Sequence, residues 1–405
     1  MRPRILFVGL GESPHASRWV SQLADQGWDI HLFSINASGI HPGFRNVTVH
    51  GFLFSRPRGL GDGIRLRGVP WPLGSIGPGQ SVRHGLELRP RWFPWAQSAG
   101  RLAGTIRRVK PDIVHSLEIF TAGSLTLEAK RCLGGAFPTW IATNWGHDVY
   151  LFGRLDDYKD KIRAVLAECD YYSAECQRDV RLAKEMGVKG EILPVLPNCG
   201  GFDLGRCAGL RQAGPTSGRR LILLKGFQDW HGRALFALRA VQLCADELKG
   251  YRIALYSADS DVKMAAELVS KSTSIPIDIV PWCSHEEMLR LHGSARIHIG
   301  INITDGISIS VLEAMVMGAF PIQSCTACAD EWIVQGQSGF IVPPEDPHVI
   351  ADAIRRAVSD DALVDQAAEI NTRIAKERLD ENVIRPQVIA MYKKILERHQ
   401  RPGVS

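Results

Sequence analysis

The chain has 405 residues, of which 45% are hydrophobic and 22% are charged, and its formal net charge is +5. These values are typical of a soluble globular protein with two domains of ordinary size. The modest positive charge does not require nucleic acid as a partner. It is compatible with a polyanionic ligand or an anionic membrane surface.

Nine cysteines are spread along the chain without a paired spacing pattern, which predicts reduced thiols in a cytoplasmic protein. One close pair, Cys325 and Cys328, could suggest redox or zinc chemistry, but no second pair accompanies it. The first apolar run is too short for a signal peptide, and no run is long enough to cross a bilayer. We therefore expect a cytoplasmic location, with a peripheral place at the inner face of the membrane as a variant.

The first 34 residues predict the opening of a Rossmann-like unit. We expect a buried strand over 4–9, a glycine-containing turn over 10–15, a helix from about 17 to 26 and a strand over 29–34. The pair Gly9 and Gly11 is a weak dinucleotide signal, because the third glycine is missing and no acidic residue ends the second strand.

Residues 56–95 lose this periodicity and are rich in Gly, Pro and Arg. Seven arginines are opposed by only two acidic residues, and the aromatic residues 92, 93 and 95 close the segment. Such a composition suits peripheral contact with anionic lipid or with a phosphate-bearing acceptor, and a solvated loop is the alternative. Nucleic acid is not expected, because no recognised binding module surrounds the segment.

We expect a helix over 96–110, a strand over 111–115 and a further strand over 139–145. The turn after strand 139–145 is a second candidate for ligand binding. His147 comes directly after the strand end, where parallel sheets bind ligands, and Asp148 follows it. The alternative for His147 is a structural histidine.

The domain organisation follows from composition and from the restart of the strand–helix pattern. Gly, Pro and Ser are frequent from 200 to 218, which predicts a linker. We predict a Rossmann-like domain over 1–198, a linker over 199–218, a second Rossmann-like domain over 219–380 and a final helix within 381–405.

The second domain opens with a predicted strand over 220–225, a turn at Gly226 and a helix over 234–243. Asp259 and Asp261 follow the next strand, 251–256. Such a DxD pair binds metal in some transferases, but its place in the second half favours a helix N-cap. A further strand over 277–283 precedes a capping box at Ser284 and Glu287, which opens a helix to His292.

The segment 305–313 lies between predicted strands 295–301 and 320–324, and its helix ends at Gly318. Asp305 and Glu313 can face one crevice, with the free N–H groups of the helix start between them. Asp305 could accept sugar hydroxyls, residues 308–310 could donate to a diphosphate, and Glu313 could accept both ribose hydroxyls. The alternative for Ser310 and Glu313 is a capping box.

This segment resembles the E-x7-E region of family 4 retaining glycosyltransferases with the GT-B fold. The chain keeps the motif residues Gly306, Glu313, Ala314 and Met315, and it has Asp305 where the family has the first glutamate. The resemblance covers nearly the whole chain and is strongest from 221 to 344. It implies an α/β protein of two Rossmann-like domains facing a central cleft, with a last helix that packs back on the first domain.

The resemblance also implies roles for residues of the predicted turns. Gly11 and His15 would line the cleft, His147 would contact the donor sugar, and the turn at Trp282 and Cys283 would hold the nucleotide base. Most family members place an Arg and a Lys on the diphosphate after the glycine that corresponds to Gly226. This chain has Phe227 and, near the Lys position, His231, so Lys225 and Arg233 are the candidate substitutes.

The sequence therefore predicts a retaining, metal-independent glycosyltransferase with a nucleotide-diphosphate sugar as donor and a glycan, lipid-linked or small-molecule acceptor. We expect no cofactor and no metal. Its predicted catalytic residues are His147, Lys225, Arg233 and Asp305. Its predicted donor-binding residues are Gly11, His15, Gly226, Trp282, Cys283, Gly306, Ile307, Ser308, Ile309, Ser310 and Glu313. A non-catalytic nucleotide-sugar-binding protein and an NAD-dependent oxidoreductase are the alternatives.

Overall fold

The structure is a computed structural model that describes residues 2–36, 39–51, 60–67 and 99–399. The chain forms two compact units, residues 1–200 with 385–405 and residues 201–384. Most of the arginine-rich segment 56–95 lies outside the described residues, so its predicted membrane or acceptor contact stays a prediction.

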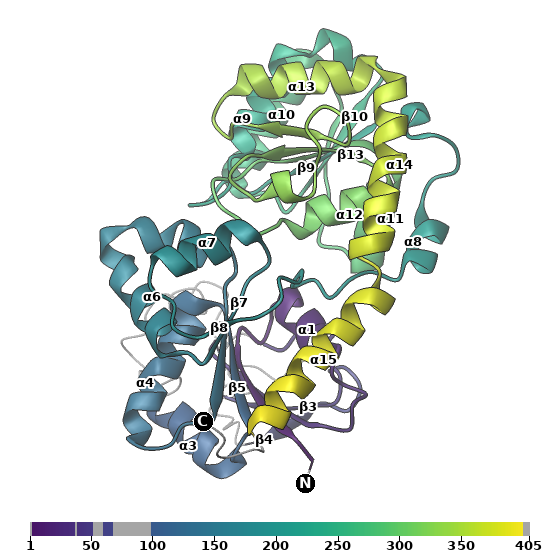
Figure 1. Cartoon of the computed structure of the whole chain (residues 1–405). Coiled ribbons are helices and arrows are strands. Elements are labelled where there is room, and N and C mark those ends of the chain that lie inside the picture. The colour runs from purple at the N-terminus through teal and green to yellow at the C-terminus, as the bar shows by residue number, and fades with distance from the viewer. Residues whose placement is uncertain (1, 37–38, 52–59, 68–98, 400–405) are drawn as a thin grey trace, which may run out of the picture. The chain divides into compact units, whose positions relative to one another are not determined.

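The first unit is built on an eight-stranded parallel sheet with the order β4-β3-β2-β1-β5-β6-β7-β8 (Figure 1). The chain adds β2, β3 and β4 on one side of β1 and then crosses to the other side with β5. The strands are β1 (Arg4–Gly9), β2 (Asp29–Ser34), β3 (Val47–His50), β4 (Arg65–Arg67), β5 (Ile113–Leu117), β6 (Thr139–Thr143), β7 (Tyr171–Ser173) and β8 (Glu191–Ile192).

Helices cover both faces of this sheet. One face carries apolar side chains from α3, α4, α6 and α7, packed on Leu6, Val114 and Trp140. The helices are α1 (Pro14–Ser21), α3 (Ala99–Val109), a π-helix (Ile119–Gly123), α4 (Ser124–Leu133), α5 (His147–Tyr150), a short 3-10 helix (Phe152–Arg154), α6 (Asp156–Glu168), α7 (Gln177–Glu185) and α15 (Glu381–His399).

The last helix, α15, packs on the opposite face beside α1 (Figure 1). The buried Tyr392 hydroxyl accepts a hydrogen bond from the Trp19 indole N–H at 2.9 Å and lies 2.5 Å from His115 Nδ1. Arg385 donates to the Asp25 carboxylate at 2.7 Å. From Arg385 onward, α15 is therefore part of the first unit.

Helix α1 begins and ends earlier than the predicted helix of about 17–26. It starts at Pro14, a residue that suits the first helical position because it has no N–H to leave unpaired. Ser13 is the N-cap, and its hydroxyl accepts the Ala16 N–H at 3.3 Å. His15 consequently lies in a helix and not in the preceding turn.

The second unit has a six-stranded parallel sheet with the order β11-β10-β9-β12-β13-β14. The prediction of two Rossmann-like units is thus confirmed. The strands are β9 (Leu221–Lys225), β10 (Arg252–Tyr256), β11 (Ile277–Ile279), β12 (Ala295–Gly300), β13 (Phe320–Ser324) and β14 (Phe340–Val342).

Two helical layers sandwich this second sheet. Helices α9, α10 and α13 pack on the face that presents Ile222, Leu224 and Ile253, and α11 and α12 pack on the face of Leu223 and Tyr256. The helices are α8 (Leu204–Leu210), α9 (Ala234–Leu243), α10 (Ser260–Thr273), α11 (His285–Ser294), α12 (Ile309–Met317), α13 (Pro347–Ser359) and α14 (Asp361–Arg378), with 3-10 turns at Thr216–Gly218, Asp246–Leu248 and Ala329–Glu331. Helix α8 occupies part of the segment predicted as a linker.

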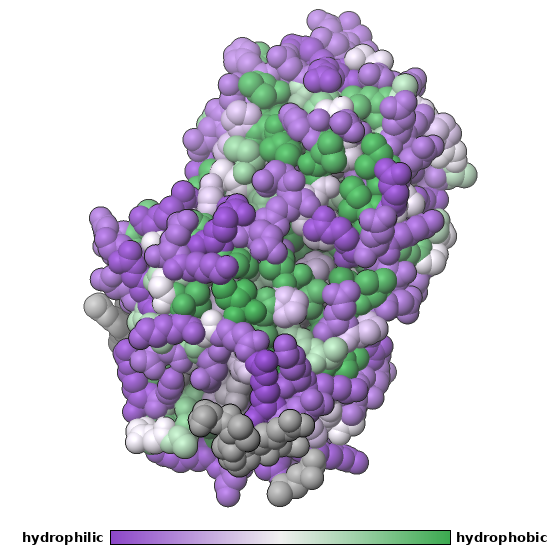
Figure 2. All heavy atoms as spheres, viewed as in Figure 1, coloured by the Kyte–Doolittle hydropathy of each residue, from purple (hydrophilic) through white to green (hydrophobic). Residues whose placement is uncertain are grey.

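Polar side chains dominate the face of the molecule seen in Figure 2, and apolar ones show in small patches between them. Among the described residues, none of the helices combines the length and the apolar composition needed to span a bilayer. Trp282 is the most exposed large apolar side chain of the described surface, at 91%.

Two histidines lie buried side by side in the first sheet. His31 Nδ1 is 2.9 Å from His50 Nε2, and His31 Nε2 is 3.2 Å from the Asp29 carboxylate. Burial, aided by the neighbouring His31, lowers the pKa of His50 to about 4. Burial also lowers the pKa of His31. The folded chain therefore holds this pair uncharged at neutral pH.

This pair makes the stability of the first unit depend on pH. An unfolded histidine has a pKa of about 6.5, so between that pH and about 4 the unfolded chain binds a proton that the folded His50 does not. His50 alone should lower the free energy of unfolding by roughly 3 kcal/mol as the pH drops through this window. Urea unfolding followed by circular dichroism at several pH values measures it.

Two variants assign that pH dependence. His50→Gln should reduce this fall by roughly 3 kcal/mol, and the part that comes from the buried His115, whose pKa burial lowers to about 3, should remain. His348→Gln, which removes an exposed histidine of α13, should keep the whole dependence. An unchanged dependence in His50→Gln would contradict the assignment.

Candidate functional site

The candidate site of the second unit lies where its strand order reverses. Strand β9 pairs with β10 on one side and with β12 on the other, so the connections leave the carboxyl ends of β9 and β12 in opposite directions. Such a switch point is where open parallel sheets bind ligands. Lys225 ends β9, and the segment 301–308 leads from β12 into α12.

The start of α12 presents unpaired backbone donors beside a cation. Ser308 is the N-cap, and the first intrahelical bonds run from Val311 and Leu312 to its carbonyl. The N–H groups of Ile309 and Ser310 therefore have no intrahelical acceptor. Lys225 Nζ donates to Ser308 Oγ at 3.3 Å, and that hydroxyl lies 2.9 Å from Ser310 Oγ. Together these groups form the donor set that binds an anion at a helix N-terminus.

Glu313 lies one turn further along α12 and is 6% exposed. Its Oε1 is 2.9 Å from His285 Nε2, and its Oε2 is 3.4 Å from His292 Nε2. Ser308, and not Ser310, is the N-cap, and no side-chain cap bond forms. The capping-box interpretation of Ser310 and Glu313 was therefore wrong: the carboxylate turns toward α11 and not toward the helix start.

Asp305 is half-buried and accepts a hydrogen bond from the Asn302 amide at 3.2 Å. The Asn302 side-chain oxygen in turn accepts from Ser324 at 2.6 Å and from Gln323 at 3.0 Å. Gly306 and Ile307, both buried, connect Asp305 to the helix start. The carboxylate is thus anchored to the ends of β12 and β13.

Gly226 must be glycine because its backbone touches the neighbouring strand connection. A Cβ there would lie 2.6 Å from the Ala258 Cα. Asp259 occupies the N-cap position of α10, as predicted, but its carboxylate accepts the Gln228 N–H at 2.8 Å and no N–H of its own helix. The residue therefore fixes the loop after Gly226.

The two predicted cations have different surroundings. Arg233 precedes α9, and its Nε donates to the Glu345 carboxylate at 2.6 Å. Lys225 lies over the Phe227 ring at 4.9 Å and bonds to Ser308. His231, near the family's Lys position, lies 2.5 Å from the Asp229 carboxylate. Of these groups, Lys225 is the one that contacts the start of α12.

Trp282 and Cys283 lie in the loop after β11, which ends at Ile279 and not at the predicted 283. The indole is 91% exposed, and partial burial raises the pKa of the Cys283 thiol. The predicted capping box of Ser284 and Glu287 is present. It begins α11 and thereby places His285 against Glu313.

Sequence reasoning placed Gly11 and His15 at an edge of the first unit, after β1. A Cβ at Gly11 would lie 2.6 Å from Ser34 Oγ and 2.8 Å from the Gly39 carbonyl oxygen, so glycine is required there for packing. The exposed His15 ring lies 5.8 Å from the Trp145 ring. His15 therefore borders the loop that carries His147.

His147 begins α5 and lies over two buried carboxyl groups. Its Nε2 is 3.8 Å from Asp148 Oδ1. Asp148 accepts N–H groups from Ile119 and Phe120, both at 3.1 Å, and from Trp145 at 2.9 Å. The ligand-type atoms of Glu118, His147 and Asp148 all lie within 4.8 Å of one another.

Glu118, which the sequence reasoning missed, directly follows β5 and has a strained backbone φ of 90°. Its carboxyl group accepts the N–H groups of Thr121 at 2.7 Å and Ala122 at 3.0 Å and so opens the π-helix. Its place directly past a strand end was the signal that could have identified it, as it did His147.

The surroundings of the two carboxyl groups favour keeping a proton on the pair. Burial and the nearby Asp148 raise the pKa of Glu118 to about 8, and burial raises the pKa of Asp148. Two carboxylates this close in a buried place do not both ionise. Backbone N–H groups already occupy acceptor positions on both carboxyl groups, which leaves fewer oxygen lone pairs for a cation.

This pair predicts an asymmetry between two substitutions. Glu118→Gln should leave the free energy of unfolding at pH 7 within about 1 kcal/mol, because an amide mimics the protonated carboxyl. Glu118→Ala should lower it by roughly 2–4 kcal/mol through orphaned N–H groups and a cavity. Urea unfolding measures both, and Glu128→Ala on the exposed face of α4 is the control. Equal damage from Gln and Ala would mean that Glu118 is ionised.

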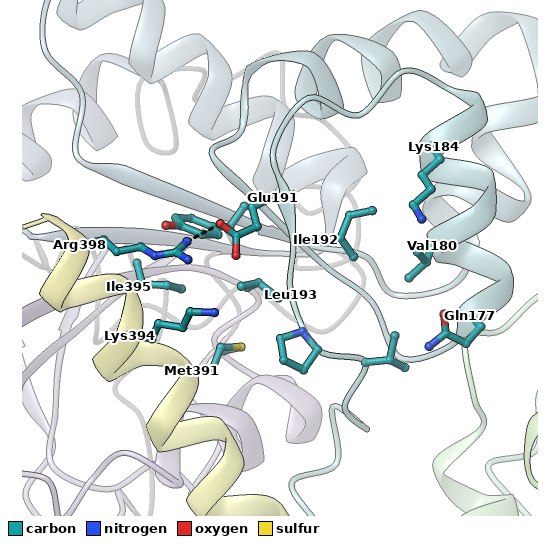
Figure 3. A pocket seen from close by; sticks show the side chains of 13 residues that line it. Gln177, Val180, Lys184, Glu191, Ile192, Leu193, Met391, Lys394, Ile395 and Arg398 are labelled. Carbon is teal, nitrogen blue, oxygen red and sulfur yellow. Dashed lines mark hydrogen bonds and ion pairs between the residues drawn. The ribbon is translucent and has the colours of Figure 1, made fainter. Parts of the chain in front are cut away.

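A separate cavity of about 470 Å³ lies in the first unit. Figure 3 shows it between α7, the chain after β8 and α15, with Arg398 paired to Glu191 at one end. Its lining consists of Tyr171, Gln177, Val180, Lys184, Glu191, Ile192, Leu193, Pro194, Val195, Met391, Lys394, Ile395 and Arg398. None of the predicted site residues is among them.

Two family models match the chain, one in each structural unit. Residues 219–360 match the model described as "Glycosyl transferases group 1", and residues 4–61 match "Glycosyl transferase 4-like". The chain is a glycosyltransferase. The matches give no support to the NAD-dependent oxidoreductase alternative. No curated protein matches the chain.

Solved structures that resemble the glycosyltransferase have the GT-B fold. The sucrose-phosphate synthase of Thermosynechococcus elongatus is 15% identical with a TM-score of 0.70, covering 98% of this chain and 100% of its own. The α,α-trehalose 6-phosphate synthase of Burkholderia multivorans is 13% identical with a TM-score of 0.69, covering 100% of both chains. Alr3699/HepE of Anabaena, solved with UDP and glucose, is 13% identical with a TM-score of 0.67, covering 97% and 100%. At these identities the likeness establishes the fold.

Proposed function

We propose that the glycosyltransferase moves a sugar from a nucleotide-diphosphate donor to its acceptor with retention and without a metal ion. The observation that carries the proposal is the start of α12, where Lys225 bonds to the N-cap Ser308 and the buried carboxylate of Glu313 follows one turn later. Retention is implied by the resemblance to family 4 and not by this geometry.

The diphosphate would bind at the helix start. The N–H groups of Ile309 and Ser310, the hydroxyls of Ser308 and Ser310, and the Lys225 ammonium supply donors and positive charge without a cation. As the sugar leaves, negative charge grows on the diphosphate, and fixed donors stabilise it most at that point. Arg233 would contribute its positive charge to the diphosphate site only if its ion pair with Glu345 breaks.

The nucleoside would lie toward α11. Glu313 is four residues beyond Ile309, the first residue of α12, or roughly 6 Å along the axis, where its carboxylate can accept ribose hydroxyls. The base would meet the loop of Trp282 and Cys283, and the exposed indole could cover one face of it.

The sugar would lie toward Asp305, whose carboxylate is anchored by Asn302 and can accept sugar hydroxyls. Gly306 and Ile307 would border it. Following the family resemblance, His147 would contact the sugar, Gly11 and His15 would belong to the acceptor-side unit, and no protein nucleophile is assigned. A glycan, a lipid-linked molecule or a small molecule remains the acceptor class.

The donor class has support from the neighbours. Alr3699/HepE structures are complexes with UDP, with UDP and glucose, and with UDP-glucose. We therefore place a uridine diphosphate sugar first among the donors to be tested.

Calorimetric titration with nucleotide-diphosphate sugars in EDTA tests the donor site. The wild type should bind one donor, and Glu313→Ala should weaken that binding by about 10- to 100-fold, because hydrogen bonds to a charged group are lost. Glu369→Ala, which removes an exposed carboxylate of α14, should bind like the wild type.

Two results would contradict the proposal. One is binding that appears only after a divalent metal is added. The other is donor binding that Glu313→Ala leaves unchanged.

A further inference from the structure

His292 is a fully buried histidine with an unusual environment. It lies in α11 and has no exposed surface. Among the described residues, neither ring nitrogen has a hydrogen-bond partner of good geometry. The nearest charged group is the Glu313 carboxylate, whose Oε2 is 3.4 Å from His292 Nε2. A buried imidazole without a hydrogen-bond partner lowers the free energy of unfolding. Its orientation toward Glu313 therefore suggests a functional role.

Two further buried side chains, His298 and Tyr256, lie close to the His292 ring. The His298 ring lies 5.0 Å from the His292 ring, and His298 Nε2 is 3.1 Å from the Tyr256 hydroxyl. Burial, together with His292 and Lys225, keeps the pKa of His298 well below its usual value, so that ring is neutral. A neutral, packed ring fixes the position of His292 without competing for the Glu313 carboxylate.

The other oxygen of Glu313 faces a different kind of partner. His285 Nε2 is 2.9 Å from Oε1, and the His285 side chain is 44% exposed. It is the first residue of α11 and directly follows the N-cap Ser284. One carboxylate oxygen thus lies beside a buried ring, while the other is covered by a ring that can move into solvent.

We propose that His292 is a positioning residue that holds Glu313 Oε2, so that Oε1 can exchange His285 for the ribose 2′-hydroxyl of the donor. His285 is then a placeholder that satisfies the carboxylate while the site is empty. The idea rests on the proposed function, because it assigns a ribose to the Glu313 carboxylate.

The proposal is tested by the ratio of the affinities for a ribonucleotide and for its 2′-deoxy form. A general loss of structure would weaken the binding of both forms and leave this ratio unchanged. Binding of UDP, ADP and GDP and of their 2′-deoxy forms is measured by calorimetry in EDTA. The wild type should prefer the ribonucleotide of its base by about tenfold or more, as expected for a hydrogen bond to a carboxylate. His292→Leu should reduce that preference to less than about threefold, and His292→Gln, which keeps a donor near the position of Nε2, should restore most of it.

His285→Ala gives an independent arm at a solvent-accessible position. Removing the placeholder should tighten binding of the ribonucleotide by about threefold and keep the ribose preference. Weaker binding would overturn the placeholder role.

The failures are distinguishable. If no ribonucleotide binds the wild type, the proposed function fails and this inference with it. If a ribonucleotide binds but His292→Leu keeps the full preference, the positioning role alone is overturned. Thermal unfolding of each variant confirms that it is folded.

Discussion

A carboxylate held almost out of water inside the second unit is the constraint on which the proposed site depends. Glu313 is 6% exposed, and burying a charge is costly unless polar partners compensate. Helix α11 supplies two histidines for this purpose, and the capping box of Ser284 and Glu287 fixes where that helix begins. The site is thus maintained by helix packing at some distance from the loop that would bind the diphosphate.

The strand order explains why these groups meet. Lys225 and the start of α12 lie on connections that leave the sheet in opposite directions at β9 and β12, so a cation and free N–H groups converge there without a ligand-specific insertion. The first unit repeats the principle at β5 and β6, where Glu118 and Asp148 form a buried carboxyl pair beneath His147. In both units these groups lie past strand ends.

Local patterns in the sequence were sufficient where local physics decides the structure. Helix α9 and strand β13 have the predicted bounds, and Gly318 ends α12 in the left-handed conformation that favours glycine. Predictions failed where a side chain could pair either with a group nearby in the sequence or with a group distant in the sequence. The spacing of Ser310 and Glu313 suits a capping box, yet the carboxylate pairs with α11. The spacing rule contains no information about that partner.

Other features had no local signal at all. Helix α14 was not predicted, although its 18 residues form the longest helix lying wholly within the described part of the second unit. His292 was predicted only as the end of a helix, because its burial against Glu313 depends on how α11 and α12 pack. Glu118 was missed because its strained φ and its nearness to Asp148 arise from the meeting of two strand ends.

The most direct test of the account is hydrogen–deuterium exchange of the wild-type chain with and without UDP in EDTA. The account predicts slower exchange of the backbone N–H groups of residues 306–310 when UDP is present, because the diphosphate accepts from the start of α12. Exchange there that UDP leaves unchanged, or that slows only when a divalent metal is added, would contradict the assignment of this helix start as a metal-independent diphosphate site.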